Sequence, residues 1–261
     1  MADRAIVLIT GASFGIGEAT AKRFADEGYR IILAARSRDK LRQIEFKLNE
    51  EHGEGTARAL PMDVTDAKGI ESAINGLPDD WQAIHVLVNN AGLALNMVPV
   101  YEHSIAEIDT MVDVNIKGVL YLVRAVVPGM LERGRGHVIN IVSTAGHDVY
   151  LNGTIYCATK HAVLALTLGL KQDLHGTPIR VTAVSPGFTE TDFSLVRFEG
   201  DAERAEKIYA DINALTPADV ADAILYCVQA PESVNVWELL LTPRAQSGAR
   251  MVLRGEAAKE P

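Results

Sequence analysis

The sequence has few of the features that mark secreted, membrane or nucleic-acid-binding proteins. Only two of its 261 residues are cysteines, Cys157 and Cys227, too few for a disulfide framework. No uncharged apolar run approaches the ~18 residues of a membrane span, and the first residues lack the pattern of a signal peptide. Basic residues are outnumbered, 25 Lys and Arg against 34 Asp and Glu, so the basic surface that phosphate backbones require is missing. We therefore expect a cytoplasmic protein that binds neither a membrane nor nucleic acid.

Internal repeats, low-complexity segments and Ser/Gly linkers are also absent from the sequence. Hydrophobic residues make up 48% and charged residues 23% of the chain, which are the proportions of a folded globular protein rather than a disordered one. The composition is even along a chain whose length fits one α/β domain. We predict a single domain over residues 1–261, with a frayed end at residues 255–261, where apolar periodicity is lost.

Short apolar runs of strand length alternate with segments of helical periodicity. The runs are mostly continuous, which is typical of strands that are buried on both faces. They lie at residues 5–10, 30–35, 56–61, 84–89, 136–143, 179–185 and 236–241. This alternation predicts a doubly wound, Rossmann-type parallel sheet of about seven strands with helices on both faces. A long, charged segment at residues 189–216 interrupts the alternation, and we expect it to form a lid over the substrate.

Glycines cluster directly after the first predicted strand. Residues 10–17 read TGASFGIG, and a helical segment follows them. Glycines at these positions allow a tight turn and a close approach of the backbone to a pyrophosphate, which the N-terminus of the next helix attracts. The pattern predicts a dinucleotide-binding loop, with an ordinary Gly-rich turn as the alternative.

Three side chains further along the chain have the chemistry of acid/base catalysis. Tyr156 and Lys160 are four residues apart and therefore share one face of a helix, where an ammonium lowers the pKa of a neighbouring phenol. Such a tyrosine can exchange a proton with an alcohol or carbonyl oxygen, which Ser143, at the end of the fifth predicted strand, can hydrogen-bond. Taken singly, these residues could be a surface pair and a cap. Together, behind the glycine loop, they predict hydride transfer between a substrate carbon and a nicotinamide.

The chain resembles the short-chain dehydrogenase/reductase family over most of its length. The resemblance depends on the G-x-x-x-G-x-G spacing, the NNAG motif at residues 89–92, Asn115, Ser143, the YCATK motif at 156–160 and the PG pair at 186–187. It implies that Tyr156 is the general acid/base, that Lys160 binds the nicotinamide ribose, that Ser143 orients the substrate and that Asn115 supports a proton relay. It also implies a homodimer or homotetramer, since helices that are apolar on several faces need cover from another subunit.

Contacts to the cofactor are implied by the same resemblance. The expected residues are Gly11, Ser13, Phe14, Gly15, Ile16, Gly17, Arg36, Ser37, Asp63, Val64, Asn90, Ala91, Gly92, Tyr156, Lys160, Pro186, Gly187, Phe188 and Thr189. Arg36 follows the second predicted strand, where an acidic residue would bind the ribose of NAD and where a guanidinium can bind a 2′-phosphate. We therefore predict NADP(H) as the cofactor. The alternative is that Arg36 is a solvated surface residue.

The substrate must be inferred from other segments. Residues 191–198, TDFSLVRF, and the residues around Tyr156 resemble the NADP-dependent 3-hydroxy acid dehydrogenases, which implies a small 3-hydroxy acid such as serine, or its oxo or semialdehyde form. A carboxylate needs a cation, and Arg197 or His147 could supply it. Alternatively, Arg197 forms an ion pair with Glu190 or Asp192, and His147 is only a loop residue. The expected substrate contacts are Ser143, His147, Tyr156, Phe193 and Arg197.

Two other functions remain open from the sequence. The first is a carbonyl reductase for neutral ketones or aldehydes, with a pocket lined by Leu93, Leu95, Met97, Tyr150 and Phe193. The second is a non-catalytic NADP(H)-binding module. We expect no metal site, because the seven histidines are scattered without ligand spacing.

Overall fold

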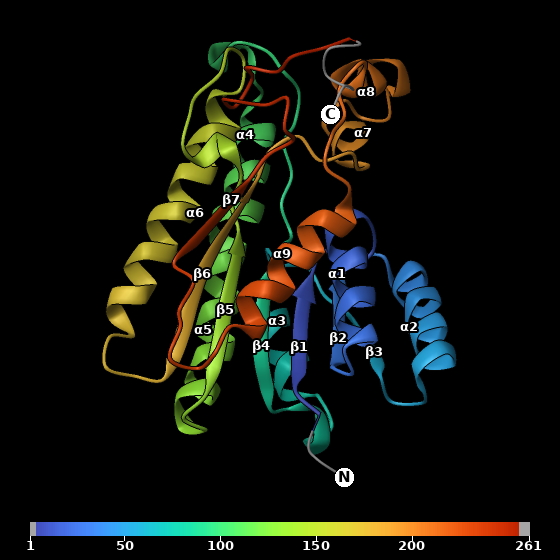
Figure 1. Ribbon diagram of the computed structural model, residues 1–261, viewed down its shortest axis with the longest axis vertical. Coiled ribbons are helices and arrows are strands. Elements are labelled where there is room, and N and C mark those ends of the chain that lie inside the picture. The colour runs from blue at the N-terminus through green and yellow to red at the C-terminus, as the bar shows by residue number, and fades with distance from the viewer. Residues whose placement is uncertain (1–3, 256–261) are drawn as a thin grey trace.

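The computed structural model describes residues 4–255, and its centre is one seven-stranded parallel sheet (Figure 1). The strand order is β3-β2-β1-β4-β5-β6-β7. The strands are β1 (Ile6–Thr10), β2 (Arg30–Ala35), β3 (Ala57–Pro61), β4 (Ile84–Asn89), β5 (Gly136–Ile141), β6 (Ile179–Pro186) and β7 (Glu238–Leu241). The predicted doubly wound sheet is confirmed. One predicted strand end is wrong in a way that matters, since β5 ends at Ile141 and Ser143 lies in the loop beyond it.

Helices cover both faces of the sheet (Figure 1). They are α1 (Gly15–Asp26), α2 (Arg38–His52), α3 (Ala67–Asn75), α4 (Ile105–Val112), α5 (Gly118–Glu132), α6 (Thr154–Asp173), α7 (Phe193–Arg197), α8 (Ala202–Tyr209) and α9 (Pro217–Gln229). Successive side chains of a strand point into different cores. In β1, Val7 and Ile9 join a core with α1, α2 and α9, whereas Ile6 and Leu8 join a core with α3 and α5. The strands are therefore apolar without alternation because both of their faces are buried.

The helical run from Ile105 to Glu132 is, by length and composition alone, apolar enough to cross a membrane. It is made of α4, one π-helical turn (Asp113–Lys117) and α5. Leu122 and Met130 of α5 are buried in the core that covers one face of the sheet. Packing on the sheet therefore accounts for much of the apolar character of this run.

Residues 189–216 form a small helical unit above the carboxyl ends of the strands, where α7 and α8 lie (Figure 1). A backbone bridge between Thr189 and Leu215 closes the base of this unit. The C-terminal segment after β7 returns to it, and Arg254 donates a hydrogen bond of 2.6 Å to the carbonyl oxygen of Ala210. The backbone N–H of Gly255 donates to the carbonyl oxygen of Asp211, and the other residues of the segment predicted to fray, 256–261, lie outside the described residues.

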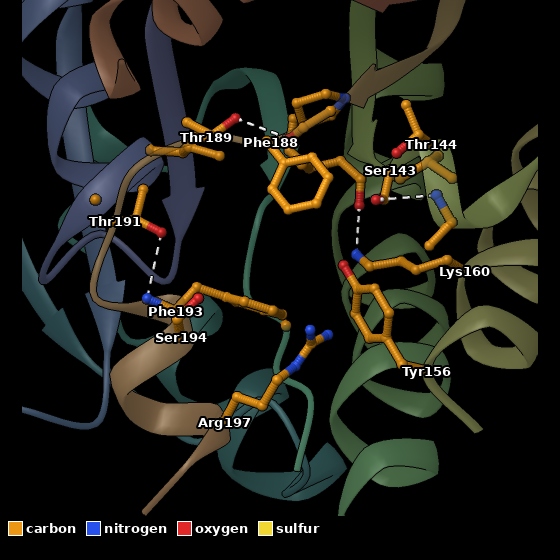
Figure 2. Close-up of a pocket in the computed structure, with 18 of the residues that line it drawn as sticks. Ser143, Thr144, Tyr156, Lys160, Phe188, Thr189, Thr191, Phe193, Ser194 and Arg197 are labelled. Atoms are coloured by element: carbon orange, nitrogen blue, oxygen red, sulfur yellow. Dashed lines mark hydrogen bonds between the residues drawn. The ribbon is translucent and has the colours of Figure 1, made fainter. Parts of the chain in front are cut away.

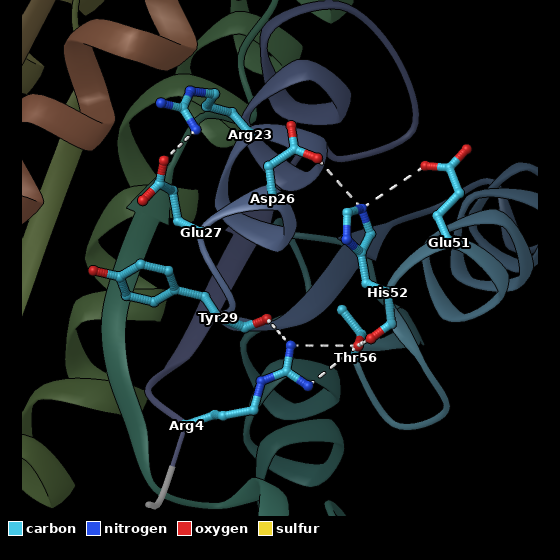
Figure 3. A network of polar contacts seen from close by, with 8 residues as sticks. All are labelled: Arg4, Arg23, Asp26, Glu27, Tyr29, Glu51, His52 and Thr56. Carbon is cyan, nitrogen blue, oxygen red and sulfur yellow. Dashed lines mark hydrogen bonds and ion pairs between the residues drawn. The ribbon is translucent and has the colours of Figure 1, made fainter.

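A polar network fixes the opposite, amino-terminal edge of the sheet (Figure 3). Arg4, which precedes β1, donates to the carbonyl oxygens of Gly28 at 2.6 Å and Tyr29 at 3.2 Å, and to the hydroxyl of Thr56 at 3.3 Å. His52, at the end of α2, lies 3.4 Å from a carboxylate oxygen of Asp26. These contacts join the starts of β1, β2 and β3, so they fix the register of the three strands relative to one another.

His137 in β5 gives the sheet a pH-dependent stability. The side chain is buried, and its Nε2 atom lies 2.8 Å from the hydroxyl of Thr182. Burial, followed by the charge of Arg180, lowers the pKa of His137 from 6.5 to about 3. Between these two values the unfolded chain binds more protons than the folded chain, so the free energy of unfolding falls as pH falls.

We expect His137→Asn to weaken the dependence of the free energy of unfolding on pH, by up to about 1.4 kcal/mol per pH unit between pH 6 and pH 4. Urea denaturation of both proteins at several pH values measures it. His175→Asn, which changes an exposed histidine, is the matched control. Identical slopes for the wild type and His137→Asn would show that protonation of His137 has no part in acid destabilisation.

Candidate active site

The glycine loop forms the turn between β1 and α1. Gly11 and Gly15 have φ angles of +64° and +58°, in the left-handed region that favours glycine. A Cβ atom at Gly17 would collide with the carbonyl oxygen of Gly11, so α1 can approach the loop this closely only with a glycine there. The N–H groups of the first turn of α1 are left available for an anion, as the spacing predicts.

Hydrogen bonds join this loop to the end of β4, where the strand order reverses. The Asn90 side chain donates to the carbonyl oxygen of Thr10 at 2.9 Å, and the backbone N–H of Ala91 donates to the Thr10 hydroxyl at 3.0 Å. Open α/β sheets bind their ligands at such a reversal. The residues that surround Thr10 therefore lie where a dinucleotide would bind.

Basic side chains follow the end of β2, next to the glycine loop. The backbone N–H of Ala12 donates to Ala34 at 3.2 Å, which holds the loop beside this strand, and Arg36 is exposed just beyond it. Lys40 of α2 lies with its Nζ atom 5.8 Å from the ring centroid of Phe14. Lys40 belongs to no motif in the sequence, and only the fold of α2 brings it to the loop.

The remaining residues that were predicted to contact the cofactor near β2 and β3 follow the ends of these strands. Ser37 is the N-cap residue of α2, and Asp63 follows β3, where its carboxylate accepts the backbone N–H of Thr65 at 2.9 Å. Val64 is buried against Gly118. These residues lie at the carboxyl edge of the sheet, but they do not line the pocket that holds the catalytic set.

Ser143, Tyr156 and Lys160 lie together on one side of the pocket, and Phe193 and Arg197 face them (Figure 2). Ser143 accepts the backbone N–H of Ala145 at 3.1 Å and lines the pocket together with Tyr156. Tyr156 and Lys160 both come from the first turns of α6. The four-residue spacing therefore places them as predicted.

Lys160 is buried, and its ammonium donates a hydrogen bond of 2.8 Å to the carbonyl oxygen of Ile141. Burial lowers the pKa of Lys160 from 10.5 to about 8. Its Nζ atom is 5.9 Å from the centroid of the Tyr156 ring. The ammonium thus lies beside the tyrosine, held by the end of β5.

The protonation of Tyr156 differs from the expectation. Desolvation raises the pKa of this phenol above 10, and the charge of Arg197 and the hydrogen bond from Ser143 act against the rise. The net direction is therefore opposite to the lowering that the spacing of Tyr156 and Lys160 predicted, because desolvation is the largest effect and helical spacing gives no measure of it. Tyr156 holds its proton at neutral pH, which is the state that donates a proton to a carbonyl oxygen.

Asn115 lies in the π-helical turn between α4 and α5. Its amide accepts the backbone N–H of Leu93 at 2.8 Å, donates to the carbonyl oxygen of Leu93 at 2.8 Å and donates to the hydroxyl of Thr159 at 3.0 Å. A Cβ atom at Gly92 would lie 3.4 Å from both Asn115 Oδ1 and Lys160 Nζ, so the absence of a side chain there lets these groups converge. Such π-helical turns occur frequently at functional sites.

Arg197 of α7 reaches the pocket as an unpaired cation. Its side chain is 7% exposed, and Nη2 donates to the hydroxyl of Tyr150 at 3.1 Å. Its Cζ atom lies 5.2 Å from the ring centroids of both Tyr156 and Phe193. Within residues 4–255 it has no carboxylate partner, and its Nε atom has no hydrogen-bond partner.

The alternative in which Arg197 forms an ion pair with Glu190 or Asp192 is therefore wrong.

His147 is placed differently from Arg197. Its Nε2 atom lies 2.7 Å from a carboxylate oxygen of Glu238 in β7 and 3.1 Å from the hydroxyl of Ser185, and it does not line the pocket. A 3-10 turn (Thr144–Gly146) directs His147 towards β6 and β7 instead.

Most of the predicted site residues line one pocket. Those present are Gly11, Phe14, Gly15, Ile16, Asn90, Ala91, Gly92, Ser143, Tyr156, Lys160, Pro186, Gly187, Phe188, Thr189, Phe193 and Arg197. Those that do not line it are Ser13, Gly17, Arg36, Ser37, Asp63, Val64, Asn115 and His147. Ile208, Tyr209, Ala249 and Arg250 also line the pocket and were not predicted, because they lie outside every motif, and Thr191 had been named only within the TDFSLVRF segment. Over residues 4–255, no group of three side chains could hold a metal ion.

A glycine loop at the strand reversal, joined to a Ser–Tyr–Lys set between β5 and α6, defines a short-chain dehydrogenase. The family model for short chain dehydrogenases matches residues 5–202 of the chain. The chain therefore belongs to the short-chain dehydrogenase family, as the motifs predicted.

Individual relatives are similar over nearly the whole chain. The NADP-dependent 3-hydroxy acid dehydrogenase YdfG of Salmonella typhi is 45% identical over 94% of this chain and 97% of its own. The serine 3-dehydrogenase of Rhizobium radiobacter is 40% identical over 93% of this chain and 95% of its own. Among solved structures, the closed form of serine dehydrogenase complexed with NADP+ matches with a TM-score of 0.90 and 42% identity, over 96% of this chain and all of that one.

We expect Gly17→Ala to displace the loop, because its Cβ would meet backbone that cannot move aside cheaply. The free energy of unfolding should fall by about 1–3 kcal/mol, and NADPH affinity should fall at least about tenfold. Denaturation and fluorescence titration with NADPH measure the two effects. Gly169→Ala, at a helical glycine with open space around it, is the control. Normal NADPH affinity in Gly17→Ala would contradict the close approach.

Proposed function

We propose that the protein transfers hydride between NADP(H) and a small 3-hydroxy acid or its 3-oxo or semialdehyde form. The observation that carries the proposal is the unpaired guanidinium of Arg197, 5.2 Å from the ring of Tyr156. A carboxylate held there would place a hydroxyl or carbonyl group close to the proton-exchanging phenol. The similar proteins named as 3-hydroxy acid dehydrogenase and serine dehydrogenase support this substrate class.

Each catalytic residue has a role that its contacts support. When bound, the reduced nicotinamide supplies the hydride for the carbonyl carbon. Tyr156 donates its proton to the carbonyl oxygen, and Ser143, next to the tyrosine, hydrogen-bonds the same oxygen. Lys160 binds the nicotinamide ribose, and Asn115 holds the loop of Leu93 against α6 and supports the proton relay.

NADP(H) is favoured over NAD(H) by the charges beyond β2. Arg36 is exposed there, and Lys40 lies against Phe14, so two cations are available for a 2′-phosphate. The glycine loop fits a dinucleotide, since its glycines take left-handed angles and leave no side chain in the way. The names of the relatives, which include NADP, agree with this choice.

A carbonyl reductase for neutral substrates is the second function to consider. Its proposed lining is divided, because Tyr150 and Phe193 line the main pocket whereas Leu93 packs in a separate apolar cluster with Met111 and Ile155. Leu95 and Met97 line a second, smaller pocket, which shares Tyr150, Tyr156 and Arg197 with the main one. The unpaired Arg197 would also be costly beside a neutral ligand. A non-catalytic binding module is disfavoured by the assembled Ser–Tyr–Lys set.

We also propose a cytoplasmic homodimer or homotetramer. Both cysteines are free and buried, as expected in a reducing compartment. Leu120 and Leu131 of α5 are 44% and 42% exposed, which gives this helix an apolar outer face for a second subunit. Size-exclusion chromatography with light scattering tests the assembly.

Turnover of a substrate panel tests the reaction. Reduction of NADP is followed with both serine enantiomers, allo-threonine, 3-hydroxypropionate, 3-hydroxyisobutyrate and neutral secondary alcohols. We expect activity with the acids. Activity with the neutral alcohols alone would overturn the substrate class and retain the mechanism.

Tyr156→Phe tests the acid/base residue. The variant keeps the ring but lacks the hydroxyl group that carries the transferred proton. We therefore expect kcat to fall by about two or more orders of magnitude, while NADPH affinity stays near the wild-type value. Steady-state kinetics and fluorescence titration measure the two quantities. Substantial residual turnover would show that another group transfers the proton.

Arg36→Asp tests the cofactor preference. A carboxylate there would repel the 2′-phosphate of NADP and accept hydrogen bonds from the ribose hydroxyls of NAD. The ratio of kcat/KM for NADP to kcat/KM for NAD should therefore fall by about tenfold or more. Arg38→Asp, which makes the same charge change two residues further on, is the control. An unchanged ratio in Arg36→Asp would mean that the phosphate is bound elsewhere.

A further inference from the structure

The C-terminal segment at residues 242–255 brings an additional cation to the pocket. The backbone N–H of Phe188 donates to the Gln246 side chain at 2.8 Å, which ties the segment to the loop after β6. Antiparallel pairing of Gln246 with Val252 then closes a turn that carries Arg250. Because both sides of the turn are held, Arg250 is presented to the pocket in a defined position.

Within residues 4–255 this cation has no acidic partner. Asp148 is the carboxylate in contact with the turn, and it accepts the backbone N–H of Ala249 at 3.2 Å. Three cations, Lys160, Arg197 and Arg250, line the pocket, and no Asp or Glu of residues 4–255 does so. The whole chain carries a net charge of −9, so this concentration of positive charge is local. Such a site favours an anionic ligand.

Both guanidinium groups lie close to Tyr150, at different depths below the surface. Arg197 donates to the Tyr150 hydroxyl at 3.1 Å, and the Cζ atom of Arg250 is 5.3 Å from the centroid of the same ring. Arg197 is 7% exposed, whereas Arg250 is exposed at the mouth. Partial desolvation and then the charge of Arg197 lower the pKa of Arg250. A ligand with negative charge at both depths would offset the repulsion between the two guanidinium groups.

The depths decide which part of a substrate each arginine can reach. Arg197 lies next to Tyr156, where the proposed function places the carboxylate nearest to the reacting carbon. Arg250 lies close to the ring of Tyr150 and is exposed to solvent, where the far end of a longer substrate would lie. We propose that Arg250 binds a second anionic group of the substrate, so that the enzyme prefers dicarboxylic 3-hydroxy acids to monocarboxylic ones of equal length. This inference rests on the proposed function.

Two substrates with the same carbon backbone test it: 3-hydroxyglutarate and its monomethyl ester, which has one negative charge fewer and one methyl group more. With saturating NADP, the wild type should show a kcat/KM about tenfold higher for the diacid, mainly through KM. Arg250→Gln should bring this ratio close to one, and Arg250→Lys should restore part of it. Arg244→Gln, which removes one exposed cation of the same segment outside the pocket, should keep the wild-type ratio.

Several outcomes would overturn the proposal. The same ratio in Arg250→Gln as in the wild type would exclude a second charge contact, and equal losses for both substrates would mean that both arginines bind one carboxylate. A raised KM for NADP alone would assign Arg250 to the cofactor phosphates. Turnover of serine without turnover of 3-hydroxyglutarate would overturn the dicarboxylate preference and leave the proposed function intact. Turnover of neutral alcohols alone would overturn both.

Discussion

The reversal of strand order between β1 and β4 is the constraint on which the site depends. The chain leaves these neighbouring strands towards opposite faces of the sheet, so their carboxyl ends are left open to a ligand. Thr10 joins the two loops there, since its carbonyl oxygen and hydroxyl accept hydrogen bonds from Asn90 and Ala91. The next strand, β5, delivers Ser143 and the helix with Tyr156 to the same edge. One topological feature thus brings together a dinucleotide loop and an acid/base group.

Burial and charge then set the chemistry of that edge. Desolvation acts in opposite directions on its two titratable groups, raising the pKa of Tyr156 and lowering that of Lys160, because it disfavours the charged form of each. At neutral pH Tyr156 is therefore uncharged, while Lys160, with a pKa of about 8, is still mostly protonated. Arg197 is a second buried cation, without a carboxylate partner among residues 4–255. A protein of net charge −9 can therefore bind an anion at one place.

Prediction from the sequence succeeded where the signal is local and failed where it depends on distant packing. The strands were found because burial on both faces leaves continuous apolar runs, and the glycine loop was found because its turn needs particular glycines. The fifth strand was predicted to end at Ser143, beyond its actual end at Ile141, since that end is fixed by pairing with β6 and not by composition. The pKa of Tyr156 was given the wrong direction, because residue spacing carries no measure of how much water a fold removes.

The sequence by itself determined the order of strands and helices, the conformation of the loop at Gly11–Gly17 and the common helix face of Tyr156 and Lys160. These depend on periodicity, on the freedom of glycine and on helix geometry, which act over a few residues. Only the tertiary structure decided that His147 pairs with Glu238, that Arg197 stays unpaired beside Tyr150 and that the C-terminal turn carries Arg250 to the pocket. These contacts join segments about 50 to 100 residues apart, and they exist only because the sheet brings its carboxyl ends to one edge.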